Sequence, residues 1–465
     1  MGLVNGLRTG DEMYKKSRFN YWCLKNQNLY LYNSYTGLDS ILKIEEGLLQ
    51  KEVKEFLEGT TDKLSESVQL LLQKKGVLVE TDIDELERVH GDRTAAVNSD
   101  RLVLTILPTS GCNFKCVYCY EDFQPKKMNA ETQEQLVKFA ERLLEGKKSL
   151  FVNWFGGEPL LAEDVVESLS KSLIELCRQK KVTYFAGMTT NGYLLNLDTF
   201  RRMLRCRVID YQITVDGLKS DHDRLRMLKD NRGSYDVIMQ NLSQISKEMR
   251  RGIFNISIRC NCLKSSMMAY EEITKQYLVM FGHDKRFSFT VHGVKDWGGE
   301  SVNALRNELM SEAEEQQLLK KALSYRGENN AGEPSIIRMD THRAMLDKHS
   351  NSCHAIGKNN YVIGTDGSIY KCTSDFEKAL GNVGNPDEIE NWFDFETDYV
   401  PDEECDKCFF YGACGRKICP KALKTGQKMC PLEKECIDEL LESIESHFFV
   451  KMEVPAVFEY KEEAT

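Results

Sequence analysis

The sequence predicts an α/β protein whose central part is a partial barrel of parallel strands. Strand-like apolar runs alternate with amphipathic stretches across the middle of the chain, which is typical of successive βα units. Short polar and glycine-containing motifs follow these runs one after another, and the chemistry of such barrels lies at the carboxyl ends of the strands. We therefore expect a partial (β/α)6, TIM-like barrel over residues 100–300.

The barrel prediction depends on six strand-like runs and on the helical stretches between them. The expected strands cover residues 102–107, 150–155, 182–188, 208–215, 253–260 and 286–292. The clearest expected helices repeat apolar residues at helical spacing and cover residues 130–144, 165–178, 235–249 and 270–281. Residues 293–300, which include Asp296 and Trp297, are expected to form a flexible loop over the barrel mouth.

A small winged-helix-like unit is expected over residues 1–95. Residues 20–33 indicate a hairpin about an Asn-rich turn, and they are followed by two helical patterns, at 48–57 and 64–74, and a short strand at 76–80. The exposed edge of such a hairpin can capture an extended peptide by strand addition, although the unit could also be a structural cap. The polar, charged residues 81–99 suit a linker.

Two further segments follow the barrel. Residues 301–345 are helical in pattern and charged, and they are expected to bridge two domains. Residues 346–465 contain most of the cysteines. In the latter segment, residues 364–372 indicate a hairpin turn that enters a strand.

Length, composition and charge exclude several classes of protein. The chain has 465 residues, of which 41% are hydrophobic and 29% charged, as expected for two or three globular domains. The net charge of −10 and the lack of a basic block argue against a nucleic-acid partner. No apolar run approaches the roughly 18 residues of a membrane span, and the first residues lack the apolar core of a signal peptide. We therefore expect a cytoplasmic protein with no membrane partner.

Sixteen cysteines in a chain of this kind indicate metal or redox chemistry, because the cytoplasm keeps thiols reduced. Three lie within residues 112–119 and eight lie between Cys353 and Cys436. The other five are expected to be small core residues, and the last two of them could also face a cavity: Cys23, Cys177, Cys206, Cys260 and Cys262.

The first cysteine group, Cys112, Cys116 and Cys119, directly follows the first barrel strand. Spacings of three and two residues let a short loop wrap one face of an iron–sulfur cube, and three thiolates leave the fourth iron without a protein ligand. Such an iron can bind and activate a second molecule. The alternatives are a zinc knuckle, which needs a fourth Cys or His close by, and free buried thiols.

This loop, with Tyr118 just before its last cysteine, resembles the hallmark of radical S-adenosylmethionine (SAM) enzymes. The resemblance implies a 4Fe–4S cluster whose open iron chelates the amino and carboxylate groups of SAM. Reduction of the cluster then cleaves SAM to methionine and a 5′-deoxyadenosyl radical, which takes a hydrogen atom from the substrate. The resemblance also implies that an electron donor of the flavodoxin or ferredoxin type reduces the cluster.

Motifs at later strand ends match further parts of the same family. The turn after the second strand, Gly156-Gly157-Glu158-Pro159, resembles the family's GGEP motif, which holds the SAM amino group. The resemblance further implies that Thr190 and Asn191, after the third strand, contact the ribose, and that Arg226 lies near the SAM carboxylate. With Tyr118, these residues form the expected SAM site.

Two residues at later strand ends are candidate catalytic groups. Asp216 ends the fourth strand, where it could equally be part of a turn-forming Asp-Gly pair. Arg259 and Asn261 end the fifth strand. His292 ends the sixth strand, where it could contact substrate or act as a base, although a lone histidine is usually structural.

The late cysteines indicate a second metal module. A zinc ribbon is an alternative, but four-cysteine zinc sites usually contain two C-x2-C knuckles, and only one is present here. The pattern resembles the seven-cysteine SPASM extension of radical SAM enzymes, which carries two auxiliary 4Fe–4S clusters. By that resemblance the outer cluster would take Cys405, Cys408, Cys414 and Cys430, and the inner cluster would take Cys353, Cys372 and Cys419.

The inner set is one cysteine short of four. Either its fourth iron is open to substrate or another ligand such as Cys436 closes it. The spacing from Cys414 to Cys419 is one residue longer than the common pattern, so the register of that ligand departs from the family.

Together the resemblances imply a peptide-modifying radical SAM enzyme that carries three 4Fe–4S clusters. The pattern and position of residues 1–95 resemble the peptide-recognition element of ribosomal-peptide maturases, which implies that this unit binds the leader of a precursor peptide. A thioether crosslink within that peptide is the expected product. Alternatives are a C–C crosslinking enzyme, an anaerobic sulfatase maturase, whose chain usually begins close to the cluster loop, and a metal-binding protein, which would not need SAM motifs.

Overall fold

The computed structural model describes residues 7–9, 12–121, 125–296, 301–329, 346–347, 353–390, 402–415, 419 and 430–448. All six predicted barrel strands are present, and their ends differ from the predictions by at most a few residues. They pair in parallel, each with the next along the chain: β7 (Arg101–Ile106), β8 (Ser149–Trp154), β9 (Thr183–Thr190), β10 (Val208–Thr214), β11 (Asn255–Cys262) and β12 (Phe287–Gly293). The central sheet is therefore the predicted parallel α/β sheet.

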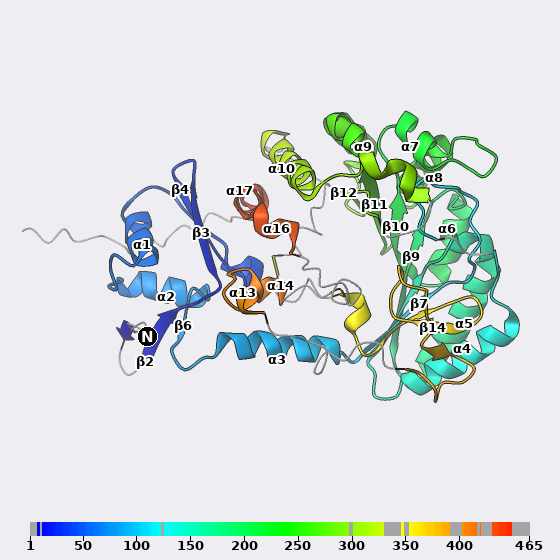
Figure 1. Ribbon diagram of the computed structural model, residues 1–465, viewed down its shortest axis with the longest axis horizontal. Coiled ribbons are helices and arrows are strands. Elements are labelled where there is room, and N and C mark those ends of the chain that lie inside the picture. Colours follow the sequence, from blue (N-terminus) through cyan, green and yellow to red (C-terminus); the bar gives the residue numbers. More distant parts are fainter. Residues whose placement is uncertain are drawn as a thin grey trace, which may run out of the picture.

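Helices cover one side of this sheet, as Figure 1 shows. They are α4 (Ala130–Leu143), α5 (Glu163–Lys180), α6 (Leu197–Arg205), α7 (Lys219–Leu225), α8 (Tyr235–Glu248) and α9 (Tyr270–Phe281), with short 3-10 turns η2 (Pro159–Ala162) and η3 (Lys264–Ala269). Asn129 and Asn196 begin α4 and α6 as N-caps, because their side chains accept backbone N–H groups of the first turn. Alternate residues of β8, among them Leu150 and Trp154, are fully buried in the large core of this layer.

The sheet continues beyond the barrel strands into the cysteine-rich segment. β13 (Asn360–Ile363) pairs in parallel with β7, and β14 (Ser368–Tyr370) and β15 (Gly381–Asn382) follow it in antiparallel pairing. The predicted turn between β13 and β14 is confirmed, and Gly367 within it has a positive φ of 83° that favours glycine. A 3-10 turn, η5 (His354–Ile356), precedes β13. The cysteine-rich segment is thus anchored on the first barrel strand.

The N-terminal unit contains two small sheets. One has the order β1 (Leu7–Thr9), β2 (Glu12–Lys16) and β6 (Leu78–Glu80), and the other has the order β3 (Asn20–Lys25), β4 (Asn28–Asn33) and β5 (Leu42–Ile44). The predicted hairpin is β3–β4. Helices α1 (Leu48–Glu58) and α2 (Glu66–Lys74) confirm the two predicted helical patterns, and η1 (Gly37–Ser40) joins β4 to β5. The predicted strand near residue 78 pairs with β2, whereas β3 is an edge strand of the hairpin sheet.

Residues 81–99, which the sequence predicts as a linker, contain a helix, α3 (Glu85–Val97). Asp84 caps its N-terminus by accepting the N–H groups of Leu86 and Glu87. Charged residues dominate its sequence, but Val89 is fully buried against Phe19 and Tyr411. The segment between the N-terminal unit and the first barrel strand is therefore helical. The sequence did not indicate this helix, because its apolar contact is made by few residues whose partners are distant in the sequence.

The predicted bridge at 301–345 is helical as far as residue 329, and its remainder lies outside the described residues. It comprises η4 (Ser301–Glu308) and α10 (Glu312–Asn329). α10 packs against α16 (Leu432–Glu435) and α17 (Ile437–Phe448). Two further short helices, α13 (Glu403–Asp406) and α14 (Tyr411–Cys414), contain Cys405 and Cys414.

The N-terminal hairpin and the late cysteine segment share one hydrophobic core, a contact that Figure 1 also shows beside β3 and α17. The rings of Tyr21 and Phe409 are 4.6 Å apart, and the Tyr21 hydroxyl lies 2.6 Å from Asp438 Oδ1. The Tyr32 hydroxyl donates to the carbonyl of Leu346 at 2.6 Å. The two distant parts of the chain therefore form one packed body. No helix within the described residues is long and apolar enough to cross a membrane.

Candidate active site

The cluster loop and the GGEP turn meet at the carboxyl edge of the parallel sheet. Glu158 N–H donates to the Gly111 carbonyl at 2.8 Å, and Gly157 N–H donates to the Thr109 carbonyl at 3.3 Å. A Cβ atom on Gly157 would lie 2.3 Å from the Gly111 oxygen, and one on Gly156, whose φ is +109°, would lie 2.5 Å from the Thr109 oxygen. Both glycines are therefore required by this close contact between the two loops.

A Gly157→Ala substitution is expected to destabilise the protein by about 3 kcal/mol, because backbone atoms of the cluster loop have no room to move aside for the methyl group. Thermal unfolding measures this. Gly91→Ala, inside α3, is the matched control, because nothing lies within 4 Å of its added Cβ atom and alanine favours a helix. Equal stability of the two variants would contradict the close contact.

Glu158 is fully buried, and its side chain is hydrogen-bonded to the residues at the end of β9. Its carboxylate accepts hydrogen bonds from Thr190 Oγ1 at 2.7 Å, Asn191 N–H at 2.7 Å and Leu160 N–H at 3.1 Å. Burial raises the pKa of Glu158, and these hydrogen bonds oppose the shift. The resemblance implies that Glu158 and Thr190 contact SAM. In the structure their side chains are instead hydrogen-bonded to each other, and Glu158 also accepts backbone N–H groups.

Asn191 connects the end of β9 to the cluster loop. Its Nδ2 donates to Asn113 Oδ1 at 2.8 Å and lies 4.0 Å from Cys112 Sγ, while its Oδ1 accepts the Tyr193 N–H. Only 5% of Asn191 is exposed. The structure therefore brings this predicted ribose contact directly beside the first cysteine.

The three cysteines of the loop are half-buried and close enough to influence one another. Burial raises the pKa of Cys112 to about 12, although the N–H of Phe114, 3.4 Å from its sulfur, opposes the shift. Burial raises the pKa of Cys116 to about 11, opposed by the nearby Arg226 guanidinium. These thiols would hold protons at neutral pH unless a metal took the protons' place, as metal binding to cysteine requires.

Two buried donors beside the loop have no acceptor among the described residues: Asn113 Nδ2 and Arg226 Nε. Arg226 is 8% exposed, and its Nη1 donates to the Tyr118 hydroxyl at 2.7 Å. Leaving a buried donor unpaired costs about 1–3 kcal/mol, so an electron-rich group is expected to meet these atoms. An iron–sulfur cluster and the carboxylate of SAM both supply such acceptors, so the residues present fit these two groups.

Tyr118 and Asp216, which are 98 residues apart in the sequence, contact each other at the centre of the site. The Tyr118 hydroxyl donates to Asp216 Oδ2, and Asn261 N–H donates to Oδ1 at 2.8 Å. Arg226 Nη1 lies 4.0 Å from the same carboxylate, which is fully buried. Burial raises the pKa of Asp216, and the Arg226 charge opposes the shift.

Both interpretations of the Asp216-Gly217 pair are therefore compatible with the structure. Gly217 has a φ of +68°, as a turn requires, and the carboxylate also holds Tyr118 in place. Asp216 is a positioning group in this arrangement, because its oxygens are hydrogen-bonded within the chain and it has no exposed surface.

His292 lies at the end of β12, paired in register with Asn261 of β11. It is half-buried at the carboxyl edge of the sheet, where the sequence predicts it. Trp297, in the predicted loop over the mouth, lies outside the described residues.

Tyr120 was not predicted to belong to the site. Burial raises the pKa of Tyr120, and the nearby groups Glu121, Cys119 and Cys372 add to this shift. Burial also raises the pKa of Glu121 to about 7. The only sequence signal for these residues is their position directly after the last cysteine of the loop.

The structure divides the late cysteines between two places. Cys353 and Cys372 flank the β13–β14 hairpin on the barrel sheet, and both are half-buried. Cys405, Cys408 and Cys414 lie on the α13–α14 segment. Cys405 and Cys408 pack against the core of Phe19, Val89 and Tyr411.

The remaining late cysteines differ in burial. Cys419 is half-buried and Cys430 is exposed, whereas Cys436 is fully buried, and its thiol donates to the Gln316 carbonyl at 3.9 Å. Burial raises the pKa of Cys436 to about 11. Within the described ranges, no three His, Cys, Asp or Glu side chains gather closely enough to hold a single metal ion.

Four of the five scattered cysteines are buried core residues as predicted: Cys177, Cys206, Cys260 and Cys262. The sulfur atoms of Cys260 and Cys262 are 3.6 Å apart, and both residues lie in the core beneath the helices. Cys23 is half-buried near Asp438, and burial raises its pKa to about 12.

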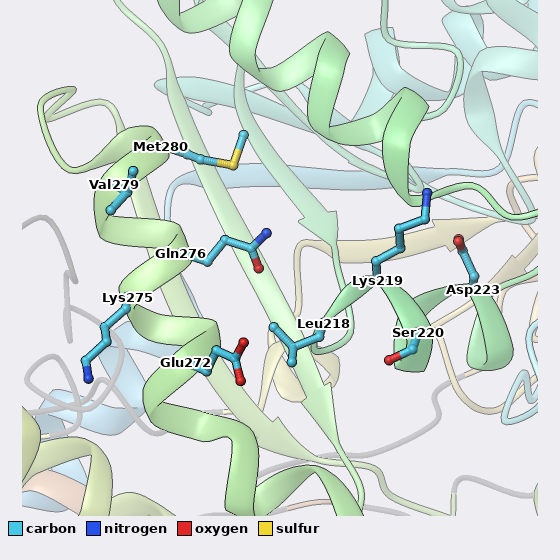
Figure 2. A pocket seen from close by; sticks show the side chains of 9 residues that line it. All are labelled: Leu218, Lys219, Ser220, Asp223, Glu272, Lys275, Gln276, Val279 and Met280. Carbon is cyan, nitrogen blue, oxygen red and sulfur yellow. The ribbon is translucent and has the colours of Figure 1, made fainter.

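A cavity of about 860 Å3 lies between α9 and the start of α7, as Figure 2 shows. Its lining includes Leu218, Lys219, Glu272 and Gln276. None of the predicted site residues lines it, so it is separate from the chemistry described above.

Comparison with known proteins defines the class. Residues 106–260 match the model of the Radical SAM superfamily, so the chain contains a radical SAM domain, which implies a 4Fe–4S cluster and SAM. GTP 3',8-cyclase of Campylobacter jejuni is 25% identical over 295 residues, which is 60% of this chain and 81% of that protein. The cysteine-type anaerobic sulfatase-maturating enzyme of Clostridium novyi is 25% identical over 149 residues, 30% of this chain and 38% of that protein.

A solved structure shares the fold. Native anSMEcpe with bound AdoMet and Cp18Cys peptide superposes with a TM-score of 0.56 at 22% sequence identity, covering 74% of this chain and 96% of that chain. The fold is therefore the α/β radical SAM fold with a mostly parallel sheet, and the domain supports an enzymatic activity.

Proposed function

We propose that this protein is a radical SAM peptide maturase that forms an intramolecular thioether between a cysteine sulfur and a carbon of a ribosomally made precursor peptide. The observation that carries the proposal is the three-cysteine loop, which is held by the GGEP turn and flanked by two buried donor atoms without acceptors among the described residues, Asn113 Nδ2 and Arg226 Nε. Cys112, Cys116 and Cys119 would hold the cluster.

When bound, the reduced cluster and SAM supply a 5′-deoxyadenosyl radical. The residues of this chain prepare its site. Gly156 and Gly157 allow the two loops to approach, while Asn191 and Arg226 present N–H donors beside the cysteines. Tyr118 is held by Asp216. His292, at the end of β12, is the proposed substrate contact.

We further propose that the late cysteines hold two auxiliary clusters. Cys405, Cys408, Cys414 and Cys430 would bind the outer one, and Cys353, Cys372 and Cys419 the inner one. The anchoring of β13 on β7 supports this, because β13 and β14, which lie between Cys353 and Cys372, extend the sheet whose strand β7 precedes the cluster loop. The burial of Cys436 among apolar residues favours Cys430 as the ligand.

If this assignment holds, the anaerobically prepared protein should contain about three 4Fe–4S clusters, hence about twelve iron and twelve sulfide per chain. Metal and sulfide analysis of the purified chain measures this. Zinc as the main metal would contradict the assignment.

A peptide substrate is supported by the peptide named in the anSMEcpe structure and by the edge strand β3 of the N-terminal unit. Capture of a leader by strand addition would use the outward N–H groups of β3. A two-residue turn joins Lys25 to Asn28, which makes these two residues a hydrogen-bonded pair of the hairpin. Hydrogen-bonded and non-hydrogen-bonded pairs alternate along antiparallel strands, so Leu24, which precedes Lys25, directs its N–H away from β4.

Leu24→Pro should therefore weaken leader binding about tenfold while leaving the hairpin paired, because it removes an outward donor and blocks the edge. Leu24→Ala keeps the N–H group and serves as the control for the lost side chain, which is 46% exposed. Affinity for the precursor peptide encoded beside the gene is the measurement. Undiminished binding by Leu24→Pro would make the N-terminal unit a structural cap.

The sulfatase-maturating relative and the shared fold favour one second candidate, the oxidation of a Cys side chain within a protein substrate. The two candidate reactions are distinguished by mass spectrometry of the peptide encoded beside the gene, after anaerobic reaction with SAM and a reductant. A loss of about two mass units with the cysteine no longer free to alkylate supports the thioether. A loss of about eighteen mass units supports the maturase, because oxidation of the cysteine side chain by two electrons, followed by water taking the place of the sulfur, gives an aldehyde and releases the sulfur as sulfide.

A further inference from the structure

Glu315 is a buried carboxylate at the carboxyl edge of the barrel sheet, and the sequence gives it no motif. It lies in the first turn of α10, where its N–H donates to the Ser311 carbonyl at 3.0 Å. Only 5% of the residue is exposed. The helix therefore holds this side chain inside the protein.

The two oxygens of the Glu315 carboxylate differ in their hydrogen-bond partners. Oε2 pairs with Lys295 Nζ at 2.5 Å, and the Lys295 side chain is 49% exposed. Oε1 is buried and has no hydrogen-bond partner anywhere in the part of the chain that the structure describes. An unpaired buried acceptor is costly, and a charged one more so, so this oxygen is expected to take a donor other than the side chains and backbone of the described residues.

The free oxygen faces the end of β12. A Cβ atom built on Gly293 would lie 2.2 Å from Oε1, so the carboxylate occupies the space that any other residue would fill there. Gly293 pairs with Cys262 at the end of β11, and His292 and Asn261 are the pair before it. Glu315 thus joins the residues at the carboxyl ends of the last two strands.

The cluster loop lies beside the same place. Val294, the residue after Gly293, belongs to one buried apolar group with Val117 and Tyr118 of the loop and with Leu225, which precedes Arg226. A ligand of the cluster loop would therefore lie next to the strand end that Glu315 overlies.

We propose that Glu315 Oε1 accepts a hydrogen bond from an N–H donor of SAM, making Glu315 a further SAM-binding residue. The inference rests on the proposed function, because it requires SAM at the cluster loop. SAM carries N–H donors in its ammonium group and in its adenine amine. Lys295 pairs with Oε2 and orients the carboxylate, which leaves Oε1 for the ligand.

The test is the equilibrium affinity of the cluster-loaded, full-length protein for SAM, measured by calorimetry without any peptide. Glu315→Ala should bind SAM about ten- to hundredfold more weakly, the range for a hydrogen bond to a charged group. Glu315→Gln keeps an acceptor oxygen and nearly the same volume, and should fall between the wild type and Glu315→Ala. Glu312→Gln, an exposed acidic residue three positions earlier on the same helix, is the matched control and should bind SAM as the wild type does.

Thermal unfolding and iron content of each variant separate binding from folding. A merely structural role for Glu315 predicts that Glu315→Gln and Lys295→Met lower the melting temperature alike and leave SAM affinity unchanged, and that result overturns the inference. Weakened SAM binding by Glu315→Gln at wild-type iron content supports it. Failure of the wild type itself to bind SAM would instead overturn the proposed function, and this inference with it.

Discussion

The variant in which Cys112, Cys116 and Cys119 are all alanine is expected to lose one 4Fe–4S cluster, about four iron per chain, and to produce no 5′-deoxyadenosine. The three thiols are the only cysteines of the loop between β7 and α4, and the buried donors beside them would lose their acceptor. Iron analysis and chromatography of the anaerobic reaction with SAM measure the two effects.

Cys177→Ala is the matched control, because Cys177 is buried in the helical layer away from the loop. It should keep its iron and cleave SAM at the wild-type rate, with a stability loss that stays within the usual cost of a small core truncation. SAM cleavage by the triple variant would contradict the assignment of the loop.

The second large effect is expected for Cys405→Ala combined with Cys408→Ala. This variant should lose the outer auxiliary cluster and stop modifying peptide, yet still cleave SAM, because the α13–α14 segment that carries these residues packs on the N-terminal hairpin and α3 instead of on the cluster loop. The measurements are iron content, 5′-deoxyadenosine formation and mass spectrometry of the peptide.

The same two cysteines also contact Phe19, so a packing defect must be separated from loss of a cluster. Phe19→Leu disturbs that apolar group while leaving both thiols in place. It should retain iron and modify peptide. Normal peptide modification by the double cysteine variant would show that the outer auxiliary cluster is not needed.

Local patterns account for what could be predicted from the sequence. Each barrel strand is a short apolar run bounded by turn residues, so all six could be located within a few residues, and parallel pairing then brings the ends of β7 to β12 to one edge. The cluster loop was visible because cysteine spacing is itself local. The helix α3 was missed because its buried contacts are few and distant in sequence.

Contacts between distant residues could not be predicted in this way. Tyr118 and Asp216 were each recognised, but nothing in the chain indicates that they touch. The GGEP motif locates Glu158 without revealing that its carboxylate points inward to Thr190 and Asn191. The contact between the rings of Tyr21 and Phe409, which joins the N-terminal hairpin to the late cysteine segment, leaves no periodic signal in the sequence.

The central claim is that SAM binds to the cluster held by Cys112, Cys116 and Cys119. Electron paramagnetic resonance of the reduced protein tests it most directly, using the variant that lacks Cys405 and Cys408 to reduce overlap from auxiliary signals. Addition of SAM should change the g values of one reduced 4Fe–4S cluster, and this change should be missing when the three loop cysteines are also replaced. A spectrum that SAM leaves unaltered, in the Cys405 and Cys408 variant with its loop cluster in place, would contradict the account.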